Sequence, residues 1–101
     1  MSSLTVIPIT ANYTLALSDV NSVVLADASS GSVTITLPDV SAPTDGINFM
    51  IKRVDTTLLV SVTIVGHNGS QTIDGSASVT TAKGSPHQIV SSAGKWYVLS
   101  N

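Results

Sequence analysis

The chain has 101 residues, of which 43% are hydrophobic and 10% are charged, and its formal net charge is −2. This length supports a single domain with a modest core. The low charge excludes a basic surface for nucleic acid, and the absence of cysteine excludes disulfides, thiolate metal sites and a thiol nucleophile. No apolar run approaches the ~20 residues that span a bilayer, so we expect no membrane partner.

The predicted elements are all β-strands. In the segment 32–37, Val33, Ile35 and Leu37 alternate with hydroxyl residues, as in a strand with one dry face. Short strands at close spacing predict an all-β fold, a small antiparallel β-sandwich or jelly-roll-like module that forms one domain over residues 1–101. In chain order, the predicted strands are 5–10, 13–17, 22–27, 32–37, 47–54, 59–65, 71–73, 77–81, 88–91 and 95–99.

The first predicted strand belongs to a candidate anchoring segment, residues 1–10. Leu4, Val6, Ile7 and Ile9 are apolar, and no tight hairpin holds this strand to the next one. Such a strand can add to the sheet of a partner. We therefore expect these four residues to bind a partner.

The longest irregular connection runs from Asp39 to Gly46 and contains Pro43 and Asp45. A proline within a loop favours extended backbone, and connections of this length project from the sheets they join. The sequence thus predicts an exposed loop at Asp39, Pro43 and Asp45.

The last predicted strand, Trp96 to Leu99, is apolar on both faces. One face has to meet the core, and we expect Trp96 to close it. The other face, with Tyr97 and Leu99, is predicted to lie at an oligomer interface, since few surface charges keep copies apart. Two alternatives stay open: a monomeric sandwich with a Thr-rich surface, and an aromatic platform for sugars on Trp96 and Tyr97.

No pattern of residues indicates catalysis, and no catalytic, cofactor or metal site is predicted. His67 and His87 lie in turn-like segments without a nucleophile motif, and whether either binds an ion stays open. The six Asp residues are explained mainly by turns. Asp55 is expected to form a weak ion pair with the neighbouring Lys52 or Arg53 on an exposed rim.

Several segments between residues 13 and 99 follow one another in a distinctive order. They are Tyr13-Thr-Leu-Ala-Leu-Ser, Val24-Leu-Ala-Asp-Ala-Ser-Ser-Gly-Ser-Val-Thr-Ile-Thr-Leu-Pro-Asp, Phe49-Met-Ile-Lys-Arg-Val-Asp, Val62-Thr-Ile, Thr72-Ile-Asp-Gly and Trp96-Tyr-Val-Leu. This order resembles that of the small β-modules of tailed-phage virion proteins. Such modules occur in capsid decoration or cement proteins, and as knobs of head and tail fibres.

The resemblance implies a structural virion protein. Because no fibre stalk accompanies the module, we expect a decoration protein that binds and stabilises the capsid shell as a homotrimer. Its partners would be further copies of itself and the major capsid protein, to which Leu4, Val6, Ile7 and Ile9 would anchor it, and no cofactor is implied. It would be made in the host cytoplasm and reside on the capsid surface of the virion. The alternative is a receptor- or glycan-binding knob of a tail or head fibre, although a glycan partner is not favoured. A small hydrolase is a third and weaker hypothesis.

Overall fold

A computed structural model of the chain describes residues 5–16, 19, 22–40, 46–55, 59–67, 71–81 and 86–100. Within these ranges the chain forms nine strands and no α-helix, which confirms the all-β class. It follows that no helix in the described ranges has the length and apolarity to cross a membrane. The strands are β1 (Thr5–Ile9), β2 (Tyr13–Thr14), β3 (Ser22–Ala26), β4 (Val33–Thr36), β5 (Asn48–Arg53), β6 (Val62–Val65), β7 (Ser78–Thr81), β8 (Pro86–Ser92) and β9 (Lys95–Ser100).

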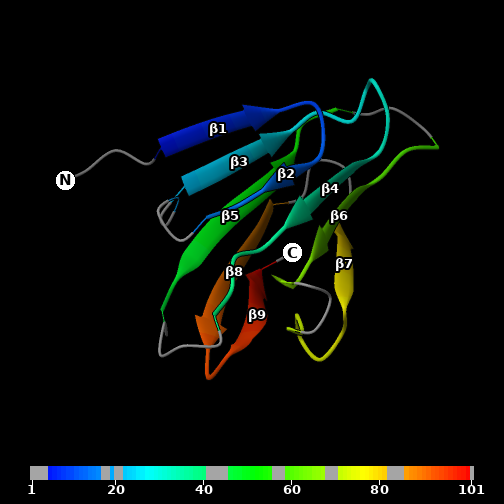
Figure 1. Cartoon of the computed structure of the whole chain (residues 1–101). Helices are drawn as coiled ribbons and strands as arrows, with labels where there is room; N and C mark the ends of the chain where they lie inside the picture. Colours follow the sequence, from blue (N-terminus) through cyan, green and yellow to red (C-terminus); the bar gives the residue numbers. More distant parts are fainter. Residues whose placement is uncertain are drawn as a thin grey trace.

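The strands form two sheets that enclose one core (Figure 1). Sheet A has five strands in the order β1-β3-β5-β8-β9, and sheet B has four in the order β2-β4-β6-β7. The molecule measures 38 × 34 × 21 Å, and its shortest dimension fits two sheets packed ~10 Å apart with side chains on both outer sides. The predicted sandwich is therefore confirmed.

The direction of the strands differs from the antiparallel, jelly-roll-like expectation. From β1 to β6 the chain crosses to the other sheet after every strand, so each sheet receives successive strands in the same direction. The pairs β1–β3, β3–β5, β2–β4 and β4–β6 are consequently parallel, and β7, β8 and β9 complete the sheets with antiparallel pairs. The alternation of apolar and polar residues has a period of two in both kinds of pair, so it cannot reveal this winding.

The core lies between the two sheets and is formed by the inward residues of both. Ile35 and Ile64 are fully buried on sheet B, opposite Ile51 on sheet A. Phe49 and Trp96 are also fully buried, with ring centroids 5.9 Å apart and planes inclined at 40°. The burial of Trp96 confirms its predicted role as a core residue.

Two tight turns carry positive backbone φ angles. In the turn between Ile73 and Ser76, Asp74 has φ 51° and Gly75 has φ 84°. In the β8–β9 hairpin, Ala93 has φ 54° and Gly94 has φ 77°. Positive φ at both central residues matches the right-handed twist of a hairpin, which is why glycine follows at the second position. The predicted strand 71–73 is reduced to isolated bridges at Ile73.

The two edges of sheet A are closed in different ways. At the β1 edge, the Ile9 carbonyl accepts a hydrogen bond from the Asp27 N–H at 3.0 Å, so the neighbouring residue Pro8 directs its backbone away from β3. Proline has no N–H to offer a further strand at that edge. At the β9 edge, the Trp96 N–H donates to the Thr72 carbonyl at 2.8 Å. Regular strand addition is therefore disfavoured at both edges.

Candidate functional site

The outward side of sheet A is covered mainly by apolar side chains. Val24 and Ala26 of β3 are fully buried, so Val23 and Leu25 point away from the core. The register of sheet A places Met50 beside Val23 on the same side. We call this side the apolar face; its apolar members are Val6, Pro8, Val23, Leu25, Met50, Val90, Tyr97 and Leu99.

Three members of the apolar face are strongly exposed. Val6 is 55% exposed, Tyr97 is 41% exposed and Leu99 is 61% exposed. Single exposed apolar side chains are ordinary, but several apolar side chains on one side of a sheet indicate a surface for contact. Tyr97 and Leu99, which the sequence analysis assigned to an oligomer interface, both belong to this surface. It forms the candidate functional site of the described chain.

Charged residues of this side lie at its margins. β5 and β9 run in the same direction because each is antiparallel to β8, so Lys52, near the end of β5, and Lys95, at the start of β9, lie at opposite ends of the sheet. Asp74 lies along the β9 edge, where its N–H donates to the Trp96 carbonyl at 2.9 Å and its carboxylate accepts the Val98 N–H at 3.1 Å. The middle of the face carries the uncharged polar residues Asn48 and Gln88 beside Val90 and Met50, and its margin carries charges of both signs.

The outward side of sheet B has a different chemistry. Ile35 and Ile64 are buried, so Thr34 and Thr63 point outward, side by side in the register. Val65 is the apolar exception among outward residues of these strands, and the others carry hydroxyl groups. We call this side the hydroxyl face, formed by Thr14, Thr34, Thr36, Thr63, Ser78 and Thr80. Water can form hydrogen bonds with the hydroxyl groups of this face, whereas it cannot do so with the aliphatic side chains of the apolar face.

A buried ion pair lies at the end of β5. The Arg53 Nε and Nη2 atoms each donate to an Asp55 carboxylate oxygen at 3.0 Å, and the two side chains are only 4% and 5% exposed. Hydrogen bonding to Asp55 raises the pKa of Arg53, which keeps the guanidinium charged. The predicted ion pair exists, but its expected exposure was wrong. The period of two in β5 places Arg53 on the inward side with Phe49 and Ile51, and this alternation is the signal in the sequence that indicates its burial.

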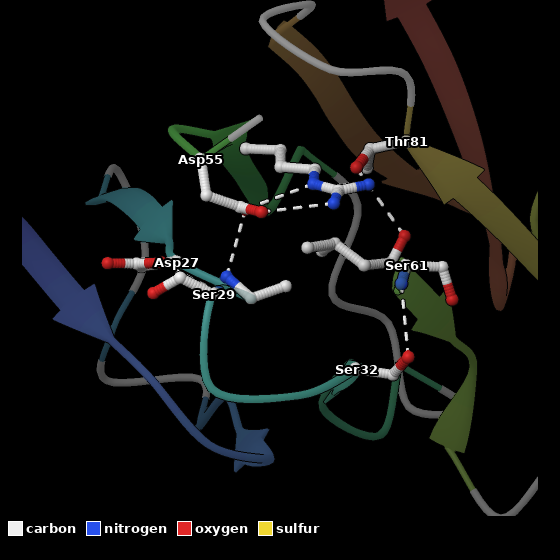
Figure 2. Close-up of polar contacts among 9 residues, drawn as sticks. Asp27, Ser29, Ser32, Asp55, Ser61 and Thr81 are labelled. Atoms are coloured by element: carbon white, nitrogen blue, oxygen red, sulfur yellow. Dashed lines mark hydrogen bonds and ion pairs between the residues drawn. The ribbon is translucent and has the colours of Figure 1, made fainter. Parts of the chain in front are cut away.

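The ion pair connects two chain segments that are distant in sequence (Figure 2). The Asp55 carboxylate also accepts the Ala28 N–H at 2.9 Å, and Asp55 lies near the turn that carries Asp27 and Ser29. Hydrogen bonds from the side chain and the backbone of Ser29 lower the pKa of Asp27. Because Arg53 and Asp55 are buried and bonded to each other, we assign them a structural role.

A second connection, between the start of β4 and the residue before β6, lies farther along the chain. The Ser61 N–H donates to the Ser32 Oγ atom at 3.0 Å, and the Val33 N–H donates to the Ser61 carbonyl at 2.9 Å (Figure 2). These bonds join the start of β4 to the residue before β6. Sequence reasoning could not find them, because Ser is common throughout the chain and each bond depends on the register of sheet B.

The predicted anchoring residues divide between core and surface. Ile9 is 8% exposed and belongs to the core, and Ile7 packs against the core. Val6 is exposed on the apolar face, and Leu4 lies outside the described residues. Of this set, Val6 is therefore the described side chain that is available to a partner.

The residues of the predicted exposed loop are only partly described. Asp39 is exposed and accepts a hydrogen bond from Gln71 Nε2 at 2.7 Å, while Pro43 and Asp45 lie outside the described residues. The Asp39 carboxylate is also 3.8 Å from His67 Nε2. This polar cluster is exposed, with side-chain exposures of 35% for His67 and 52% for Asp39.

His87 is 5% exposed, and its Nδ1 atom finds no hydrogen-bond partner among the described residues. The described parts of the chain contain no group of three potential metal ligands and no detectable pocket.

Comparison with known proteins adds no assignment to this picture. The sequence matches no protein family model and no curated protein.

Proposed function

We propose that this protein is a structural protein of a tailed-phage virion that decorates the capsid as a homotrimer. The apolar face is the observation that carries the proposal. A small domain that displays apolar side chains across one outer sheet face, and hydroxyl groups across the other, is suited to work by surface contact. This supports an assembling protein in preference to an enzyme.

The resemblance to virion modules supplies the biological setting of the proposal. Its segments coincide with structural elements of the described chain: Val33–Thr36 is β4, Asn48–Arg53 is β5 and Lys95–Ser100 is β9. The resemblance therefore concerns residues that build both sheets and the core. It favours a virion as the location, after synthesis in the host cytoplasm, and we propose the capsid surface as the position on the virion.

A trimer gives this role a physical mechanism. Three identical copies would contact several major capsid proteins at once, so that weak individual contacts combine into strong attachment. Attachment across neighbouring capsid subunits would resist the outward pressure of packaged DNA. Nothing in this mechanism requires a cofactor or chemical turnover.

Binding to capsids tests the proposal directly. The purified protein would be mixed with emptied capsids of the phage that encodes it, prepared without this protein, and the mixture sedimented. We expect saturable recovery of the protein with the capsids and a higher temperature of capsid disruption. A matched sample with host cells tests the alternative of a receptor-binding fibre knob. Recovery on cells without recovery on capsids would replace the proposal by that alternative.

A further inference from the structure

We propose that the apolar face is the surface through which copies of this chain bind one another. This inference rests on the proposed homotrimer and names its interface. The occupant of the face is a second copy of the chain, and the hydroxyl face takes no part in this contact. The proposal depends on three properties of the apolar face: the contrast with the hydroxyl face, its size and the placement of its charges.

The contrast between the two outer faces provides an internal comparison. Both outer faces are formed by the same chain and meet the same solvent, so their residues can be compared directly. Threonine at positions such as Thr34 and Thr63 shows that this chain places hydroxyl groups on strand positions that face water. Val23, Leu25 and Met50 occupy the equivalent outward positions of sheet A. These residues are the kind that protein contacts remove from water.

The size of the face suits an interface between copies. Five strands spaced ~4.8 Å apart, with about six residues at ~3.3 Å each, cover a flat area of roughly 500 Å². Side chains enlarge the accessible area of such a face beyond its flat projection. A standard interface buries about 600–1,000 Å² on each partner. The accessible area of one sheet face of this module therefore approaches the lower end of that range.

The charges at the margin fit a second copy of the same chain. Lys52 and Lys95 mark the two ends of the sheet, and Asp74 lies along the β9 edge beside Tyr97. A neighbouring copy carries the same lysines and the same aspartate, so positive and negative charges are both available to pair across the contact. In a cyclic trimer each copy contacts two neighbours, so different parts of the face meet in each contact. The middle of the face contains the uncharged polar residues Asn48 and Gln88, and among the described residues it has no charged group whose burial would oppose the contact.

The test compares one substitution on each outer face. Leu99→Asp places a charge on the apolar face, and Thr80→Asp places the same charge on an exposed strand residue of the hydroxyl face. Val6→Asp is a second apolar-face variant on a different strand. All three sites are exposed, so the core is untouched; circular dichroism and thermal unfolding check that each variant folds.

Association is measured by multi-angle light scattering and sedimentation over a dilution series. We expect the unmodified chain and Thr80→Asp to form the same oligomer. Leu99→Asp and Val6→Asp should raise the dissociation concentration about 10- to 100-fold, because a charge replaces a buried aliphatic side chain. The inference is overturned if folded apolar-face variants associate like the unmodified chain, if Thr80→Asp is equally disruptive, or if the unmodified chain is monomeric.

The outcome of this test is separable from that of the capsid test. An oligomer that Leu99→Asp dissociates, but that does not bind capsids, would support the interface and contradict the decoration function. An oligomer that binds capsids and is insensitive to Leu99→Asp and Val6→Asp would support decoration and contradict the interface. In that case the apolar face would be assigned to the shell.

Discussion

At the scale of single residues, Gly66 shows a constraint that sequence patterns do not reveal. It is buried directly after β6, and a Cβ atom there would lie 1.7 Å from the carbonyl oxygen of Gln71. Gln71 is itself fixed, because its Oε1 atom accepts the Val40 N–H at 3.0 Å and its Nε2 atom donates to Asp39. The chain therefore needs glycine at position 66 for close approach of two backbone segments.

We predict that Gly66→Ala destabilises the protein by about 2–3 kcal/mol, because the added methyl group forces the two segments apart. Gly75→Ala is the matched comparison: its Cβ would meet no atom within 4 Å, and its φ of +84° alone opposes the substitution. That backbone strain costs about 1 kcal/mol. Urea unfolding of both variants measures the difference, and equal losses would show that the contact with Gln71 relaxes.

At the scale of elements, the buried pair of Arg53 and Asp55 joins the end of β5 to the turn after β3. Asp55 accepts hydrogen bonds from the guanidinium and from the Ala28 N–H, so one carboxylate serves two segments. Removing one partner of a buried pair leaves the other charge without compensation. Such a pair holds the two connections in one arrangement.

We predict that Asp55→Ala lowers the melting temperature more than Asp39→Ala, because Asp55 is 5% exposed and Asp39 is 52% exposed. The double variant Arg53→Leu with Asp55→Ala should recover part of the loss, since no buried charge then remains. Thermal unfolding of the three variants tests this. A double variant that is less stable than Asp55→Ala would mean that Arg53 stabilises the fold independently of Asp55.

At the scale of the whole molecule, Trp96 connects β9 with the interior shared by both sheets. Its ring is fully buried, lies 5.9 Å from Phe49, and its Nε1 atom has no hydrogen-bond partner among the described residues. A buried ring cannot stack on a sugar from solvent. The exposed neighbour Tyr97 is the aromatic residue of this strand that a partner can reach.

We predict that Trp96→Ala costs about 3–5 kcal/mol, a large part of the 5–15 kcal/mol that stabilises a typical domain. Trp96→Phe should cost less, because it keeps much of the ring and removes an unpaired buried N–H. Chemical denaturation of both variants provides the measurement. If Trp96→Ala unfolded at the same denaturant concentration as the unmodified protein, the core would not depend on this ring.

Much of the fold was predictable because strand alternation is a local property. The segment from Val33 to Leu37 has to place its aliphatic residues on one side, and Gly75 and Gly94 follow turn residues that need positive φ. The same locality identified Trp96 as a core residue and Tyr97 and Leu99 as an outward pair. These features depend on residues that are close in sequence.

The tertiary structure decided what depends on residues that are distant in sequence. A strand has the same alternation of apolar and polar residues whether the chain then returns to the same sheet or crosses to the other one. The parallel winding of β1 to β6 could therefore not be predicted from this alternation. The exposed apolar face arises only when Val6, Met50 and Leu99, from three different strands, lie on one side of sheet A. The burial of Asp55 likewise depends on contact with Ala28 of another connection. The sequence by itself determined which residues can form strands and turns, whereas the packing of the two sheets decided which of their outward residues share a surface.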